Sequence, residues 1–214
     1  MISHNKVTQA TNLIMKVKRE EAWKHFITLV KSGELDDPEL FNAAFRFTYP
    51  FLSMGKSNRT EIESIAGRIN RELASTPEML DLFDSLPSQI TIYRGGSVKE
   101  YESGLLGVSW SLERGVAEYF AFFNYYGTEP HIVMSASINK EDVLAMFDAY
   151  DECEVLCLVD PSCVKIETDC PSNLLDKYIE RHHKHSEELG DNSIEVLRKG
   201  LTQNNQKGVN NMET

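Results

Sequence analysis

The hydrophobic pattern of the chain changes at Gln89, and this change constrains the fold more than any other feature. Before Gln89 apolar side chains recur every three or four residues, the spacing of amphipathic helices. From Gln89 onward β-branched and aromatic residues dominate, and several runs alternate apolar with polar side chains, as strands do. The sequence therefore predicts an α+β protein: a helical N-terminal region, residues 1–87, packed on a compact β-sheet core, residues 88–170.

Capping residues and prolines mark where the helices start and stop. The helical spacing itself runs through Ala10, Leu13, Ile14 and Val17 and again through Trp23, Phe26, Ile27 and Val30. Further helices are predicted from Asp37-Pro38 through Phe45, from Thr60 through Leu73, and from Thr76-Pro77 to about Ser85. A C-terminal helix is expected within residues 171–200, reaching about Glu188, and residues 201–214 are predicted to be a disordered tail.

The strands are predicted from alternation and from short apolar runs. These segments are Gln89–Tyr93, ended by Gly95-Gly96, then Gly107–Ser111, His131–Asn139, Glu154–Asp160 and Val164–Glu167. Residues between Gly96 and Gly107 are expected to form a polar loop. Ser111 is expected to be the N-cap of a helix that carries Val116, Ala117, Phe120 and Ala121.

Composition excludes several classes of function. The 214 residues contain 22 Lys+Arg against 33 Asp+Glu, a net charge of −11, which argues against a protein that binds nucleic-acid backbones. No run of 18 apolar residues is present, so no transmembrane helix is expected. The N-terminus lacks the apolar stretch and cleavage site of a secretory signal, and a cytoplasmic location is expected.

The cysteines and histidines do not have the spacing of metal ligands. Cys153, Cys157, Cys163 and Cys170 contain no CxxC pair, so reduced, partly buried thiols are favoured over a zinc site. His182, His183 and His185 lie in a charged stretch that is typical of a solvated helix face. No metal is therefore expected.

Two chemically loaded segments lie at predicted strand ends in the first half of the core. Arg94 offers a fixed charge for a phosphate or carboxylate, and Gly95 and Gly96 would let a ligand approach the backbone closely. The alternative is a structural arginine in an internal ion pair. Ser109 and Ser111 flank Trp110 and share one side of an extended segment. The alternative there is that one serine bonds a buried polar group while the other caps a helix.

The third segment contains two glutamates. In an extended conformation Glu152 and Glu154 share one face, about 7 Å apart. Two carboxylates that close repel each other, which raises one pKa and leaves the other group ionised. This division suits glycosidic chemistry, in which one carboxylate stabilises an oxocarbenium-like centre and another activates the attacking group. The alternative is a solvated acidic loop at the start of a strand.

Taken in order, these segments resemble the motifs of the mono-ADP-ribosyltransferase superfamily, of the Arg, Ser-x-Ser, Glu-x-Glu class. The matching text is Tyr93-Arg94-Gly95, Ser109-Trp110-Ser111 followed by Ala117–Ala121, and Glu152-Cys153-Glu154-Val155-Leu156, and it is most similar to small bacterial and phage forms. The resemblance covers Thr91 to Val164, about a third of the chain. The sequence departs from the commoner Ser-Thr-Ser form at Trp110, and Cys153 is the central residue of its acidic motif.

The resemblance implies a split β-sheet core of the ADP-ribosyltransferase type that binds NAD as co-substrate. It implies that Arg94 anchors the NAD phosphates and that Gly95, beside Gly96, bonds the nicotinamide amide through its backbone. Ser109, with Ser111 in the same motif, would hold the site together. Phe120 or Tyr119 would stack on nicotinamide. Of the two catalytic residues, Glu154 would bond the ribose 2′-hydroxyl and stabilise the oxocarbenium, and Glu152 would activate the acceptor.

The expected function is transfer of ADP-ribose from NAD to a macromolecular acceptor, with release of nicotinamide. The resemblance implies that Glu152 goes with an arginine side chain as acceptor. The likeness to phage and bacterial forms also implies an effector that modifies a host protein in the bacterial cytoplasm. Two alternatives stay open. One is an NAD glycohydrolase of the same fold, with water as acceptor, and the other is a catalytically inactive module that binds a nucleotide or a partner.

Overall fold

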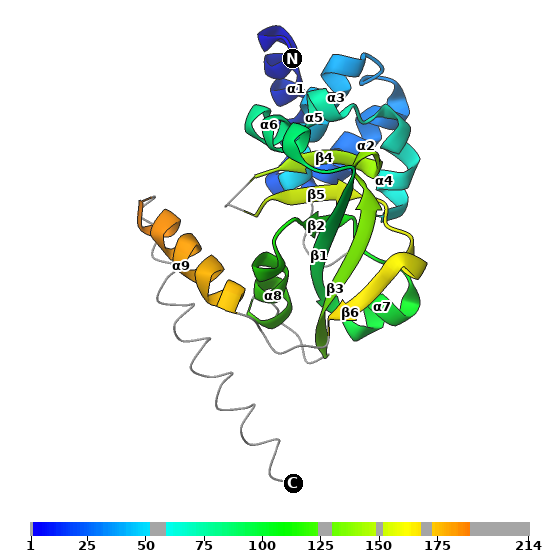
Figure 1. Cartoon of the computed structure of the whole chain (residues 1–214). Helices are drawn as coiled ribbons and strands as arrows, with labels where there is room; N and C mark the ends of the chain where they lie inside the picture. Colours follow the sequence, from blue (N-terminus) through cyan, green and yellow to red (C-terminus); the bar gives the residue numbers. More distant parts are fainter. Residues whose placement is uncertain (1, 52–58, 124–129, 149–151, 168–172, 189–214) are drawn as a thin grey trace, which may run out of the picture.

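The computed structural model describes residues 2–51, 59–123, 130–148, 152–167 and 173–188. Within them the chain is an α+β protein, as predicted: a group of helices precedes an antiparallel sheet (Figure 1). The helices before the sheet are α1 (His4–Ile14), α2 (Ala22–Ser32), α3 (Pro38–Thr48), α4 (Arg59–Ile65), α5 (Arg71–Ala74) and α6 (Pro77–Ser85). A 3₁₀ turn, Tyr49–Phe51, follows α3 directly.

The sheet has six strands in the order β4-β5-β2-β1-β3-β6, and each neighbouring pair is antiparallel. The strands are β1 (Gln89–Ser97), β2 (Ser109–Ser111), β3 (His131–Asn139), β4 (Val143–Phe147), β5 (Glu154–Cys157) and β6 (Val164–Glu167). Three helices accompany them: α7 (Val98–Ser103), α8 (Arg114–Phe122) and α9 (Asn173–Glu188). The short strand β2 therefore lies between β1 and β5, although about forty residues separate it from β5 in the sequence.

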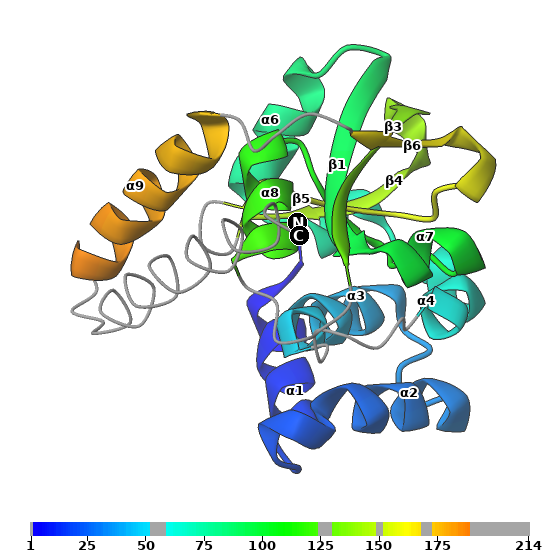
Figure 2. The same ribbon diagram turned by 90° about the horizontal axis from the view of Figure 1, so that it is seen from below.

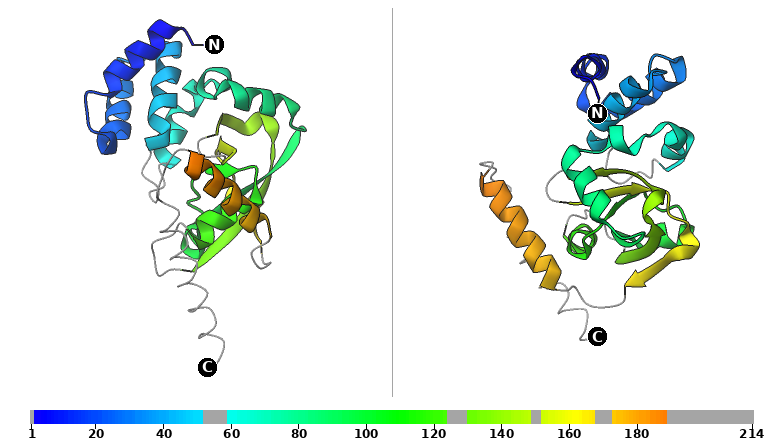
Figure 3. Two further views of the ribbon diagram at one scale, coloured as in Figure 1. Left: turned by 90° about the vertical axis from the view of Figure 1, so that its left-hand side faces the viewer. Right: turned by 45° about the horizontal axis from the view of Figure 1, so that its top comes forward.

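The N-terminal helices pack on the sheet, and they do so at its β4–β5 end. Phe26, Phe41 and Phe45 are fully buried, and they join one hydrophobic cluster with Phe147 of β4 and Leu156 of β5. Figures 1 and 3 show α1, α2 and α3 grouped at this end. The contact fixes the helical region against the two strands whose ends carry the acidic motif.

Helix α8 covers the sheet at β1. A Cβ placed on Gly95 would collide with the carbonyl oxygen of Ala117 and would come within 2.5 Å of the backbone nitrogen of Ala121. The absent side chain thus allows α8 to pack directly on the strand. On its other side α8 contacts α9, as Figures 1 and 2 show, through a cluster that includes Tyr119 and Tyr178.

Several predicted boundaries are confirmed. Helix α3 begins at Pro38 with Asp37 as N-cap, whose carboxylate accepts a hydrogen bond from the backbone N–H of Leu40 at 2.8 Å. Strands β3 and β6 have the predicted bounds, and α6 begins at Pro77 after Thr76. Helix α9 is present to Glu188, whereas residues 189–214 and Cys170 lie outside the described residues.

Other predictions are wrong. The single helix from Thr60 to Leu73 is divided into α4 and α5, because Asn70 accepts from the Leu73 N–H and caps a new start. Strand β1 does not end at Gly95-Gly96 but continues to Ser97, paired with β3 throughout. The N-cap of α8 is Glu113 and not Ser111.

Two elements were not predicted at all. Helix α7 occupies the segment expected to be a loop, and β4 was not recognised as a strand. Among the described residues no helix has both the length and the apolar character needed to cross a membrane.

Candidate active site

Three neighbouring strands bring the predicted motifs together. Ser111 of β2 lies opposite Tyr93 of β1 on one side and opposite Glu154 of β5 on the other. Because paired residues share a face and the faces alternate, Ser109, Ser111 and Glu154 lie on the same face of the sheet. Trp110 is 2% exposed and packs in the core of the opposite face, as the alternation predicts.

The Glu154 carboxyl is surrounded by hydrogen-bond donors and a cation of the protein. It is partly buried, and its Oε1 accepts a hydrogen bond of 2.7 Å from the Tyr49 hydroxyl. Burial raises the pKa of Glu154, while hydrogen bonds from the Ser109 and Tyr49 side chains and the charge of Arg94 act in the opposite direction. Burial is the largest of these effects, so the pKa of Glu154 lies above its usual value, and the donors and the cation limit that rise.

Arg94 follows Tyr93 in β1, and its side chain reaches toward Ser109 of the neighbouring strand β2. Its guanidinium donates through Nε to Glu100, at 2.8 Å, and through Nη1 to the carbonyl oxygen of Ser109, at 2.6 Å. The internal ion pair that the sequence left open as an alternative is therefore present. It fixes a side chain that is still 22% exposed. Ser109 influences both charged groups, since its carbonyl oxygen accepts from Arg94 and its side chain acts to lower the pKa of Glu154.

Gly107 and Glu100 complete the environment of Arg94. A Cβ on Gly107 would collide with the Arg94 guanidinium, so the absence of a side chain there makes room for the arginine. Glu100 Oε1 accepts from Arg94 and also, at 2.7 Å, from the backbone N–H of Gly107. The Glu100 carboxylate thus holds the Arg94 guanidinium and the Gly107 backbone beside each other.

Glu152 lies outside β5, and the prediction of an extended Glu152–Glu154 segment is wrong. Cys153 between them has φ of 42°, a left-handed conformation that turns the backbone immediately before the strand. Even so, Glu154 contributes to the environment of Glu152. Burial first, then the charges of Glu154 and Asp148, raise the pKa of Glu152 to about 8. The pKa values of both glutamates are therefore raised, and the division into one protonated and one ionised carboxyl stays a prediction.

The Ser111 hydroxyl makes hydrogen bonds to backbone groups. It donates to the carbonyl oxygen of Glu152 at 2.7 Å and accepts from the N–H of Glu113 at 2.9 Å, and the residue is 4% exposed. It therefore holds the turn that carries Glu152. This bond to a buried polar group is the alternative that the sequence left open for the serine pair.

The remaining predicted ligand-binding residues, Gly95, Gly96 and Phe120, are in contact with other parts of the protein. Gly95 lies under α8, so the packing of a helix accounts for its missing side chain. A Cβ on Gly96 would lie 2.6 Å from Glu100 Oε2 and 2.7 Å from Met134 Cε, so side chains already fill that space. Phe120 and Tyr119 contact the α8–α9 cluster, where their rings pack edge to face at 5.7 Å.

The described residues contain no group of three or more His, Cys, Asp or Glu side chains arranged to hold a metal ion. Cys153, Cys157 and Cys163 are free thiols, and burial raises the pKa of both Cys153 and Cys157 to about 12. His182, His183 and His185 lie on α9, and the side chains of His182 and His185 are outside the described part of the chain. At neutral pH the thiols of Cys153 and Cys157 stay protonated, which makes them poor nucleophiles.

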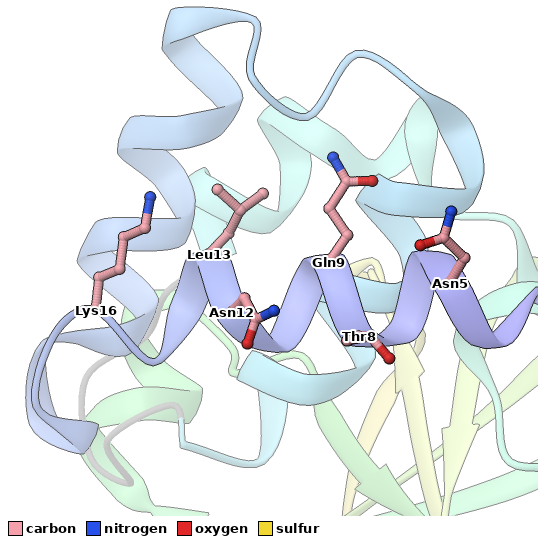
Figure 4. A pocket seen from close by; sticks show the side chains of 6 residues that line it. All are labelled: Asn5, Thr8, Gln9, Asn12, Leu13 and Lys16. Atoms are coloured by element: carbon pink, nitrogen blue, oxygen red, sulfur yellow. The ribbon is translucent and has the colours of Figure 1, made fainter.

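A hollow of about 300 Å³ lies on the surface of α1, away from these residues (Figure 4). Its lining side chains all come from that helix and the turn after it: Asn5, Thr8, Gln9, Asn12, Leu13 and Lys16. None of the site residues predicted from the sequence lines this hollow. The position of the motifs, and not this hollow, defines the candidate site.

Sequence reasoning missed Tyr49 and Glu100. Tyr49 precedes Pro50, and a residue before proline indicates only the end of a helix. Glu100 was assigned to a loop. The available signals were an aromatic residue with a polar group at a helix end, and an acidic residue six positions after the candidate residue Arg94. Both signals are too common to have identified these residues.

Comparison of the chain with models of protein families, with curated proteins and with solved structures finds no match.

Proposed function

We propose that the protein is a mono-ADP-ribosyltransferase that moves ADP-ribose from NAD to a macromolecular acceptor and releases nicotinamide. The observation that carries the proposal is the connected group of Arg94, Ser109 and Glu154 on the neighbouring strands β1, β2 and β5. A guanidinium suits the phosphates of a dinucleotide, and an adjacent carboxylate suits a developing positive charge. The motif resemblance supports the ADP-ribosyltransferase type for the fold and NAD for the substrate.

The reaction requires that the bond between ribose C1′ and the nicotinamide nitrogen breaks, with its electron pair leaving on nicotinamide. Glu154 would bond the ribose 2′-hydroxyl and place negative charge beside C1′ as that carbon becomes cationic. Arg94, fixed by Glu100, would hold the phosphates. Because these groups are already oriented by the protein, little reorganisation accompanies the step.

Glu152 would serve the acceptor. Its pKa of about 8 keeps most of the carboxyl protonated at neutral pH, close to the range in which a general base works best. When the acceptor nucleophile forms its bond to C1′, its proton would pass to ionised Glu152. An arginine acceptor would itself favour the ionised form, because a guanidinium beside a carboxylate lowers the pKa of that carboxyl. This supports the arginine preference implied by the resemblance.

The resemblance to small phage and bacterial forms also supports a biological role. The acceptor would be a host protein in the bacterial cytoplasm, and the protein would act there as an effector. The net charge of −11 suits a basic acceptor surface, since opposite charge speeds association.

Labelled NAD distinguishes the transferase from its alternatives. Purified protein is incubated with NAD labelled in the adenine moiety and with bacterial lysate, beside the Glu154→Gln variant. Label on lysate protein, absent with the variant, is the expected result. Free labelled ADP-ribose without protein labelling would instead assign a glycohydrolase. Unchanged NAD, together with no NAD binding by calorimetry, would contradict the enzyme proposal and leave a binding module.

A further inference from the structure

The strongest feature outside the family motifs is the contact between the N-terminal helical region and Glu154. Tyr49 begins the 3₁₀ turn that follows α3, and 105 residues separate it from the glutamate to which it donates. The bond of 2.7 Å is short, as is usual for a hydroxyl that donates to a carboxylate. The helical region therefore contributes a hydrogen-bond donor to the candidate site.

The ring of Tyr49 is held in place by aromatic packing. It is 4% exposed, and it stacks on Phe147 with centroids 4.7 Å apart and an interplanar angle of 21°. Phe45 packs on it at 5.5 Å. Phe147 lies opposite Glu154 in the β4–β5 pair, so the residue that holds the ring is the strand neighbour of the residue that receives the bond. The hydroxyl has little freedom to turn away.

We propose that Tyr49 is a positioning residue of the active site, which fixes the Glu154 carboxylate in the orientation needed to stabilise positive charge at the ribose. This inference rests on the proposed transferase function and assigns part of the site to the helical region. It also gives residues 1–87 a second role besides covering the sheet.

The charges around Glu154 determine what loss of the hydroxyl would do. The groups that face it are Tyr49 from the 3₁₀ turn, Ser109 from β2, Arg94 from β1 and Glu152 from the turn before β5. Burial raises the pKa of Tyr49 well above its usual value, so the phenol stays protonated and remains a donor at working pH. Without it the carboxylate loses one donor, and the pKa of Glu154 rises further.

The test substitutes Tyr49→Phe, which keeps the packed ring and removes only the hydroxyl. Tyr101→Phe is the control, since Tyr101 of α7 is a partly buried tyrosine that lies outside the proposed machinery. The expected result is a loss in kcat of about 10- to 100-fold with little change in the KM for NAD, because the bond acts on a charged group in the transition state. The loss should be greatest at low pH and partly recovered at high pH. An equal loss at every pH, or none, would overturn the proposal.

A second measurement does not depend on turnover. The carboxyl ¹³C signal of Glu154, identified by its absence in Glu154→Gln, is titrated in Glu152→Gln and in the same variant that also carries Tyr49→Phe. Using Glu152→Gln removes the coupled carboxyl. A higher pKa of Glu154 after Tyr49→Phe supports the proposal, and an unchanged pKa overturns it. If the wild type releases no nicotinamide, the proposed function fails, while this titration still decides the role of Tyr49.

A further variant covers the case in which Tyr49→Phe does not fold. 3-Fluorotyrosine incorporated at position 49 keeps the ring and the hydroxyl but is a more acidic and stronger donor. The expected result is a lower pKa of Glu154 than in the unmodified protein. An unchanged or higher pKa would contradict the inference.

Discussion

Arg94 donates to the carbonyl oxygen of Ser109 across the β1–β2 pair, with 2.6 Å between the atoms. The same guanidinium donates to Glu100 at 2.8 Å, so two partners in different directions fix its plane. The Ser109 side chain in turn acts to lower the pKa of Glu154. Ser109 is therefore in contact with the proposed phosphate-binding cation and influences the proposed catalytic anion. A change in the position of Arg94 should affect both NAD binding and Glu154.

Arg94→Lys should weaken NAD binding. An ammonium keeps the charge but lacks the planar fork that bonds Glu100 and Ser109 at the same time. We expect the KM for NAD to rise by about 10-fold or more, corresponding to about 1.4 kcal/mol. Arg71→Lys is the matched control, because Arg71 also bonds a carbonyl and a carboxylate, those of Val143 and Glu141, away from the site. Equal KM values for the two variants would contradict the role given to Arg94.

Ser111→Ala should separate transfer from NAD cleavage. The substitution leaves the carbonyl of Glu152 without its 2.7 Å bond, which loosens the turn carrying Glu152 but leaves Tyr49 and Ser109 on Glu154. We expect transfer to an acceptor to fall more than nicotinamide release into water, measured in parallel assays. The exposed Ser85→Ala, which removes a local bond on α6, is the control. A parallel fall of both activities would argue against this separation of roles.

Gly95→Ala should destabilise the fold. The new methyl group would collide with backbone atoms of α8, which cannot yield without moving the helix. Overpacking of this kind costs about 1–3 kcal/mol in the free energy of unfolding, measured by urea denaturation. Gly67→Ala is the matched control, since a Cβ there meets no atom within 4 Å. If Gly95→Ala were as stable as Gly67→Ala, the packing of α8 on β1 would be wrong.

Glu152→Gln should make stability less dependent on pH. The folded protein holds the Glu152 proton up to about pH 8, whereas the ordinary value is 4.5, so the folded state binds more protons between these pH values. Stability of the wild type therefore falls as the pH rises from about 4.5 to about 8. Gln removes this titration. We expect the Tm of the variant to match the wild type near pH 5 and to exceed it at pH 9, by calorimetry. A Tm difference that stays constant from pH 5 to pH 9 would show that the Glu152 carboxyl has an ordinary pKa.

Local signals predicted those elements in which local preference and tertiary context agree. Strand β3 has apolar residues at every second position, Ile132, Met134, Ala136 and Ile138, and pairs along its whole length with β1. The Asp37-Pro38 start of α3 is a capping motif that needs no tertiary help. Strand β4 has the sequence VLAMF, which favours helix as much as strand, and its conformation comes from pairing with β5.

The candidate site was predicted in its residues and less well in its geometry. Arg94, Ser109 and Glu154 lie on the neighbouring strands β1, β2 and β5, although they are far apart in the sequence. The order of the motifs indicated that these residues belong to one site. The left-handed Cys153 could not be predicted, since glycine and asparagine are the usual residues there. Nor could the Tyr49–Glu154 bond, which forms only after helices and sheet have packed.

The most direct test of the account is nicotinamide release from NAD by wild-type protein and by Glu154→Gln, measured at neutral pH with a protein lysate present. Gln keeps the size of Glu154 and one acceptor oxygen, which can still accept from Tyr49, and it removes the charge. The account predicts release by the wild type and a loss of about 100-fold or more in the variant, the magnitude typical of removing a group that stabilises developing charge. Equal rates for the two proteins, or no release by either, would contradict it.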